Sequence, residues 1–148
     1  MKKSQGFTAV ELIISLVVIG LLAAVSAVPF ANIARRNALD ATATAIATAL
    51  RQARAQTLAS VGSDQYGVKI DGDRYTLFKG AVFSSSTPSN STFMFSSYVS
   101  ASSTQNVFVF KKVTGNAVTS GMIEAYLRGS PSTKKVIMVE STGLANIK

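Results

Sequence analysis

Apolar residues are concentrated near the N-terminus of this sequence. No formal charge lies between Glu11 and Arg35, so residues 12–34 form an uncharged run of 23 residues. As an α-helix this run would be about 35 Å long, enough to cross a bilayer core of about 30 Å. A pair of lysines precedes the run and a pair of arginines follows it, so flanking charge does not define its orientation. The pattern predicts a membrane-spanning helix.

Helical periodicity continues beyond the uncharged run. Apolar or small residues recur at intervals of 7, 4, 3 and 4, at Leu39, Ile46, Leu50, Ala53 and Thr57. Such a narrow face is suited to packing against a sheet. The spacing predicts an amphipathic helix within residues 35–62 that ends near Ser60, with Gly62 as its stop.

From Gln65 the apolar period changes from helical to two. Alternating residues on both sides of Asp71-Gly72-Asp73 predict a β-hairpin. Serine and threonine dominate residues 84–105, which predicts a long surface loop with one short strand around 93–95. Further strands are predicted at 107–111, 122–128, 134–139 and 144–147, with turns at 115–116 and 129–132. The expected fold class is therefore α+β, with a long N-terminal α-helix packed on antiparallel β-sheet and a β head domain over 63–148.

Composition narrows the functional classes. The 148 residues contain no His and no Cys, which excludes disulfides, thiol nucleophiles, His-based catalytic triads and thiolate or imidazole metal sites. We expect no enzymatic activity and no cofactor or metal. Fifteen Lys and Arg stand against seven Asp and Glu, for a net charge of +8, which raises nucleic acid or an anionic membrane as a partner.

The uncharged run admits three interpretations. It could be a secretory signal peptide cut after Ala27, with small residues at 25 and 27, but it is long for that purpose and Glu11 lies near its start. It could be a plain membrane anchor. A third interpretation also accounts for the residues before the run, where a short basic segment ends in Gly6 and Phe7-Thr8-x-x-Glu11 opens the apolar helix.

These residues resemble the class III leader of type IV pilins and type II secretion pseudopilins. The resemblance covers the first 34 residues, and it is specific because the glycine, the aromatic residue and the glutamate have set offsets. It implies that a prepilin peptidase cuts after Gly6, removes the leader 1–6 and methylates the new amine of Phe7. Residues 7–34 would then be a transmembrane helix and later the core of a helical filament.

The same resemblance implies location and partners. The chain would be a single-pass protein of the inner (cytoplasmic) membrane, with its head outside the cytoplasm, and then part of an extracellular or periplasmic filament. Its partners would be the prepilin peptidase, other pilins or pseudopilins, the inner-membrane assembly platform and the lipid bilayer. The function implied is that of a structural subunit of a type IV pilus or a type II secretion pseudopilus.

The chemistry of Glu11 agrees with this interpretation. An unpaired charge inside a membrane costs about 2.5–3.5 kcal/mol at the centre, so a carboxylate at its edge needs a partner. Cleavage after Gly6 would create a cationic amine on Phe7, four residues before Glu11. Pairing with the amine of its own or a neighbouring chain would set the register between helices and make Glu11 a subunit-assembly residue. The alternative is that Glu11 only reaches the membrane interface.

Two residues can weaken the predicted membrane helix. Pro29 removes a backbone donor, so a kink or local opening is expected there. In pilins a glycine and a proline bracket a helical stretch that loosens on assembly, and Gly20 and Pro29 resemble that pair. The alternative for Pro29 is an ordinary membrane-helix proline that its surroundings accommodate.

A second resemblance concerns the amphipathic helix. Residues 49–57 are similar to the LR-x-AR-x-x-A helix of the GspH/FimT group of minor pilins and pseudopilins, in which Arg51 and Arg54 take the arginine positions. Some FimT-like pilins bind DNA through arginines after a C-terminal glycine, but the residues that follow Gly143 include no arginine. A DNA-binding minor pilin that serves DNA uptake is therefore the alternative function. Its candidate contacts are Lys111, Lys112, Lys134 and Lys135.

Three remaining motifs have ordinary explanations. Asp71 and Asp73 lack the further ligands of a calcium loop, so a hairpin turn is expected. Glu124 and Glu140 could pair for glycoside chemistry only if the fold brought them together. Asn90-Ser91-Thr92 is a glycosylation sequon that matters only in a glycosylating compartment, and O-linked sugars on the Ser/Thr-rich loop are suggested by the pilin resemblance alone.

Overall fold

The computed structural model describes residues 6–59 and 64–148, with residues 25–29 described by their backbone alone. It divides into two compact units, Met1–Ala34 and Arg35–Lys148. A single helix, α1 (Ala9–Leu58), contributes to both. The helix ends slightly before the predicted Ser60. Both Ser60 and the predicted stop Gly62 lie outside the described residues.

In the first unit the helix carries large apolar side chains that remain exposed. The predicted membrane span, residues 7–34, falls within this unit. Among the described residues, no helix combines the length and the apolarity that crossing a membrane requires.

In the second unit the helix has a buried face. The predicted apolar positions are confirmed, since Leu39, Ile46, Leu50, Ala53 and Thr57 are all buried. Alanines at positions 43 and 47 widen this face and allow close approach of the strands. Thr57 is accommodated because its hydroxyl donates to the Ala53 carbonyl (2.8 Å) and accepts from the Tyr66 N–H (2.9 Å).

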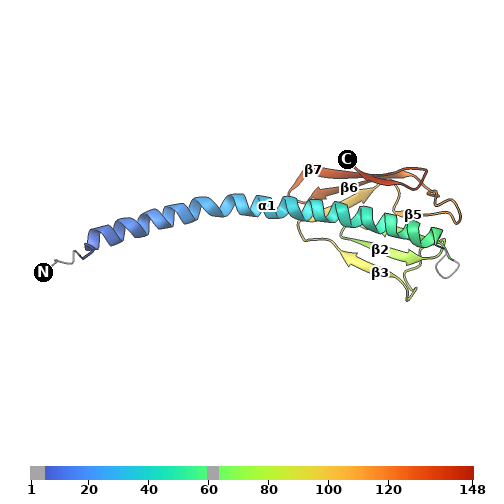
Figure 1. Cartoon of the computed structure of the whole chain (residues 1–148), viewed down its shortest axis with the longest axis horizontal. Coiled ribbons are helices and arrows are strands. Elements are labelled where there is room, and N and C mark those ends of the chain that lie inside the picture. Colours follow the sequence, from blue (N-terminus) through green and yellow to red (C-terminus); the bar gives the residue numbers. More distant parts are fainter. Residues whose placement is uncertain (1–5, 60–63) are drawn as a thin grey trace. The chain divides into compact units, whose positions relative to one another are not determined.

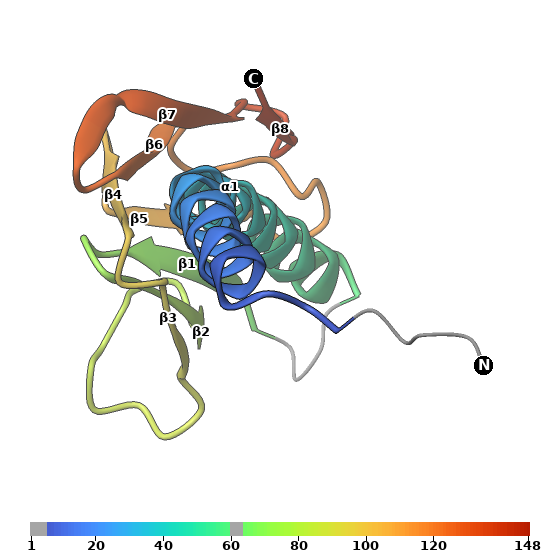
Figure 2. The same cartoon turned by 90° about the vertical axis from the view of Figure 1, so that its left-hand side faces the viewer.

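The strands form two four-stranded antiparallel sheets. Sheet A has the order β3-β2-β1-β5 and sheet B the order β4-β6-β7-β8. In the head, Figures 1 and 2 show β6 and β7 above the second half of α1, and Figure 1 shows β2 and β3 below it. The bounds are β1 Tyr66–Ile70, β2 Arg74–Lys79, β3 Ser91–Met94, β4 Val99–Ser103, β5 Val107–Val109, β6 Gly121–Leu127, β7 Ser130–Val139 and β8 Ala145–Ile147.

One core joins the helix to both sheets. Its strand residues include Val68, Phe108, Ile123 and Ile137, each fully buried together with Ile46 and Leu50 of the helix. This arrangement confirms the predicted α+β class, in which a helix and two sheets bury their apolar faces against one another.

Two of the predictions for the strands are wrong in detail. Residues 99–103 were expected in a loop because serine dominates them, but they form β4, in which Val99 and Ala101 face the core and β6 provides the hydrogen bonds. The turn predicted at 129–132 is shorter, because Leu127 already pairs with Ser130 and β7 begins there. Pairing with a neighbouring strand outweighed local composition in both places.

Part of sheet A is buried on both faces, which the predicted one-sided alternation did not anticipate. Tyr75 and Leu77 pack against the core as expected, but Thr76 and Phe78 are buried on the opposite face. There Phe78 meets Phe83 of the following loop edge to face at 5.4 Å. Gly67 is required beneath the ring, because an added Cβ would lie 2.5 Å from Phe78 Cζ.

Candidate functional site

The start of α1 is held by a reciprocal hydrogen-bond arrangement. The Glu11 carboxylate, through Oε2, accepts from the Thr8 backbone N–H (3.1 Å) and from the Thr8 hydroxyl (3.0 Å). The Glu11 N–H donates in turn to Thr8 Oγ1 (3.3 Å). This is a capping box, in which Thr8 is the N-cap and Glu11 the third helical residue. The carboxylate also lies at the positive end of the helix dipole, which favours a negative charge.

The capping role of Thr8 is a functional feature that the sequence analysis missed. Its signal was present, since a Thr followed three residues later by a Glu is a capping box pattern. Glu11 therefore already has hydrogen-bond partners within its own chain. Pairing with an amine would add to the capping box rather than supply the first partner of Glu11.

Gly6 and Phe7 lie immediately before the helix and are accessible. Both are exposed, and Phe7 has 81% of its surface accessible. An added Cβ at Gly6 would meet no atom within 4 Å among the described residues. The peptide bond that joins the two residues is thus outside secondary structure and open to another protein.

The helix of the first unit has a bare apolar surface. Thirteen large apolar side chains between Phe7 and Ile33 are each at least 47% exposed: Phe7, Val10, Leu12, Ile13, Ile14, Leu16, Val17, Val18, Ile19, Leu21, Leu22, Phe30 and Ile33. They occur on all sides of the helix, and a helix that is hydrophobic all round is normally buried in a protein or in lipid. This surface therefore needs a partner outside the described chain.

The two predicted loosening positions are only partly described. Gly20 lies within α1, and among the described residues no atom other than the nearby helix backbone lies within 4 Å of an added Cβ there. The backbone at Pro29 is assigned to the same helix, but its side chain is outside the described residues. A kink or opening at Gly20 and Pro29 stays a prediction.

The two arginines of the 49–57 segment connect the helix to the C-terminal part of the head. Arg51 Nη2 donates to the Ala145 carbonyl (2.8 Å), and Arg54 Nε donates to the Gly115 carbonyl (3.0 Å). Gly115 and Gly143 both have positive φ, and an added Cβ at Gly143 would clash with the Gly115 carbonyl and with Arg54. Arg54, Gly115 and Gly143 therefore form a tight structural contact that sequence spacing did not reveal.

The lysines proposed as DNA contacts have different surroundings. Lys134 Nζ lies 2.7 Å from Glu124 Oε1, and Lys135 Nζ lies 3.1 Å from Asp40 Oδ1. Lys111 and Lys112 are exposed in the segment between β5 and β6. Since two of the four cations already face carboxylates, the geometry gives no support to a phosphate-binding surface.

The carboxylates considered for catalysis are not brought together. Glu124 lies opposite Val136 in β7, four positions from Glu140, which corresponds to about 13 Å along a strand. Glycoside hydrolysis uses carboxyl groups roughly 5–9.5 Å apart. Glu140 instead accepts from the Asn146 side chain at 3.2 Å.

The hairpin turn between β1 and β2 is confirmed, and its carboxylates are paired with cations. Asp71 Oδ1 lies 3.0 Å from Lys69 Nζ, and Asp73 accepts both Arg74 Nε (2.9 Å) and Arg74 Nη2 (3.0 Å). The hydrogen bonds from the Arg74 side chain lower the pKa of Asp73, and the same pair raises the pKa of Arg74. No group of three potential ligands for a metal ion occurs among the described residues.

The first 27 residues match the family described as the prokaryotic N-terminal methylation motif. No curated protein sequence matches the chain.

The fold is similar to that of solved pilin structures. The type IV minor pilin FimU of Pseudomonas aeruginosa (strain PAO1), in the P21 crystal form, superposes with a TM-score of 0.62 at 15% identity, over 76% of this chain and 90% of that chain. The minor pseudopilin EpsH of the Vibrio cholerae type 2 secretion system gives a TM-score of 0.57 at 14% identity, over 74% of this chain and 95% of that chain. At sequence identities of 14–15%, these similarities show a shared fold only.

Proposed function

We propose that this chain, which joins a prokaryotic N-terminal methylation motif to a pilin fold, is a structural subunit of a type IV pilus or a type II secretion pseudopilus. The observation that carries the proposal is the apolar helix of the first unit, whose large apolar side chains are exposed and which begins within the motif. A filament of packed helices would cover that surface.

Maturation begins at the accessible segment before α1. A prepilin peptidase cuts between Gly6 and Phe7, and the new amine of Phe7 is methylated. The exposure of both residues and their position outside the helix support this assignment. Thr8 keeps its capping role after the cut, because it is the second residue of the mature chain.

Assembly transfers the apolar helix from lipid to protein. The helix first resides in the inner membrane with the head outside the cytoplasm, and it then packs against the helices of other pilins or pseudopilins. Both hydrogen bonds from Thr8 end on Glu11 Oε2, so among the described bonds Oε1 is left for the amine of Phe7. The partner is the amine of the same chain or of a neighbouring chain, and a pair between neighbouring chains sets the axial register of the subunits.

The test separates maturation from assembly. Gly6→Ala is expected to leave the leader attached, which mass spectrometry of the full chain detects as the retained mass of residues 1–6. Glu11→Gln is expected to mature normally but to reduce the yield of sheared filaments, because the neutral amide is no ion-pair partner for the amine.

Matched controls make both results specific. Gly129→Ala places a methyl group in open space in the head, and Glu124→Gln removes a carboxylate from an ion pair on sheet B. Neither control is expected to change maturation or filament yield. Normal maturation of Gly6→Ala together with normal assembly of Glu11→Gln would refute the proposed function.

A further inference from the structure

A groove of about 630 Å³ lies on the face of sheet A that is turned away from the helix. Its floor comes from the ends of β1, β2 and β3, and its opposite wall comes from the loop over residues 80–90. An antiparallel sheet commonly leaves its second face to solvent. Here the 80–90 loop covers one end of that face, and the groove lies at the other end.

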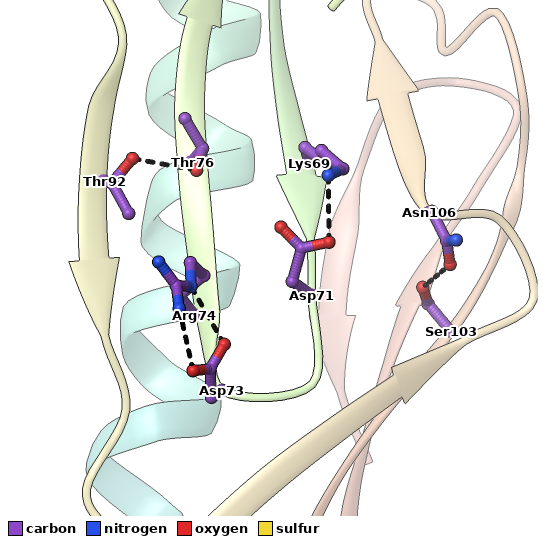
Figure 3. Close-up of polar contacts among 8 residues, drawn as sticks. All are labelled: Lys69, Asp71, Asp73, Arg74, Thr76, Thr92, Ser103 and Asn106. Carbon is purple, nitrogen blue, oxygen red and sulfur yellow. Dashed lines mark hydrogen bonds and ion pairs between the residues drawn. The ribbon is translucent and has the colours of Figure 1, made fainter. Parts of the chain in front are cut away.

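The floor carries a row of polar side chains. Lys69, Thr76 and Thr92 occupy neighbouring register positions on three strands. Thr76 is only 4% exposed, and its hydroxyl shares a hydrogen bond of 3.0 Å with that of Thr92. Figure 3 shows this pair beside the two ion pairs of the hairpin turn.

The loop wall is ordered by its own contacts. Phe83 lies under Lys69 Nζ, which is 4.7 Å from the ring centroid, and Asn90 Nδ2 donates to the Ser84 carbonyl at 2.8 Å. The other amide atom, Asn90 Oδ1, is buried without a hydrogen-bond partner among the described residues.

The turn that carries the carboxylates is also held in place. The Gly72 carbonyl accepts from Ser100 Oγ (2.6 Å) and from the Ala101 N–H (3.1 Å), both from β4. Asp71 and Asp73 are thereby fixed at one end of the groove. A site with positioned donors and acceptors loses less entropy when a ligand binds.

The charges of the groove balance. Lys69 faces Asp71 and Arg74 faces Asp73, so two cations stand against two carboxylates. A phosphate or a nucleic acid would meet both carboxylates, and a metal cation would meet both cationic side chains. A neutral ligand rich in hydroxyl groups meets neither obstacle, because each hydroxyl both donates to a carboxylate and accepts from Lys69 or Arg74.

We propose that this groove binds a neutral saccharide. Asp71 and Asp73 accept hydrogen bonds from sugar hydroxyls, Lys69 and Arg74 donate to them, Thr92 adds a hydroxyl on the floor, and Phe83 forms the apolar wall. This site is separate from the maturation and assembly residues, which all belong to the first unit. The head therefore binds a saccharide whether or not the chain is part of a filament.

The experiment uses the full chain in a zwitterionic, sugar-free detergent, since glycoside detergents would compete. Maltohexaose and cellohexaose are titrated in calorimetry and in amide NMR spectra, and hexagalacturonate and inorganic phosphate are titrated in parallel. We expect saturable binding of a neutral hexaose with shifts at Lys69, Arg74 and Thr92, and no binding of the anions. Asp73→Asn and Thr92→Val are expected to weaken binding, about tenfold for the charged acceptor.

Glu124→Gln is the matched control, because it removes a carboxylate from a similarly exposed ion pair on the other sheet. It should bind the hexaose as the wild type does. Tyrosine fluorescence melts verify that each variant is folded. The proposal is overturned if neither neutral hexaose binds, if the anions bind more tightly, or if the groove variants bind as well as the control.

Discussion

The two halves of α1 differ in what covers their apolar side chains. In the first half, residues such as Leu16 and Leu21 are more than 60% exposed, whereas in the second half Ile46 and Leu50 are completely buried. The second half is rich in alanine, so the strands approach closely, and the first half is rich in large aliphatic residues. The head buries the second half of the helix. The exposed apolar surface of the first half is typical of a site that contacts another protein or lipid.

The largest expected effect distinguishes the two halves directly. Leu50→Ala should lower the free energy of unfolding of the head by about 2–5 kcal/mol, because it leaves a cavity in the shared core. Leu16→Ala should change it by no more than about 0.5 kcal/mol. All four tyrosines lie in the head, so tyrosine fluorescence in a urea titration reports this unit. If both variants lowered the free energy of unfolding equally, the proposed difference between the two halves of α1 would be contradicted.

A smaller effect tests how the head holds its helix. Gly143→Ala should destabilise the head by about 1–3 kcal/mol, because φ is +80° there and the new Cβ would meet the Gly115 carbonyl and Arg54. The same substitution at Gly129 enters open space and should be nearly neutral. The same urea titration measures both. Neutral behaviour of Gly143→Ala would show that this contact does not constrain the head.

In the first half of α1, a substitution at the N-cap is expected to destabilise only the first turn of the helix. Thr8→Ala should destabilise the first turn of α1 by about 0.5–2 kcal/mol, because it removes the N-cap hydroxyl. Hydrogen exchange at the Leu12 N–H, which donates to the Thr8 carbonyl at 3.2 Å, should accelerate while exchange in the head stays unchanged. Ser15→Ala is the control, because its hydroxyl bonds a carbonyl within the helix and caps nothing. Unchanged exchange at Leu12 would argue against the capping box.

The smallest effect is a pH dependence confined to the head. Arg74 lowers the pKa of Asp73 below its ordinary value of about 3.9, so the folded state holds this proton less tightly than the unfolded state. The contribution of the ionised Asp73 to the stability of the folded state is present above about pH 3.9. It is lost as the pH falls through the lower pKa that Asp73 has in the folded state. Thermal melts from pH 6 to pH 2 should show a shallower acid loss for Asp73→Asn than for the wild type. If Asp73→Asn lost thermal stability more steeply with falling pH than the wild type, the predicted direction of the effect would be wrong.

Much of the fold follows from local pattern. The helix, the first hairpin and most strands were predicted, because periods of 3.6 and 2 depend on neighbours within a few residues. Strand β4 was missed because its serines are typical of loops, and only its pairing with β6 makes it a strand. The capping box of Thr8 and Glu11 was readable in the sequence, since both residues lie within one turn.

The sequence by itself determined the N-terminal motif, the apolar first half of the helix and the α+β class, because each depends on residues close together in the chain. Only the tertiary structure decided the rest. Arg54 meets Gly115 across 61 positions, Lys135 pairs with Asp40, and the groove on sheet A needs β1, β2, β3 and the 80–90 loop at once. Such contacts depend on how sheets and helix pack around one core, and no local period encodes that packing.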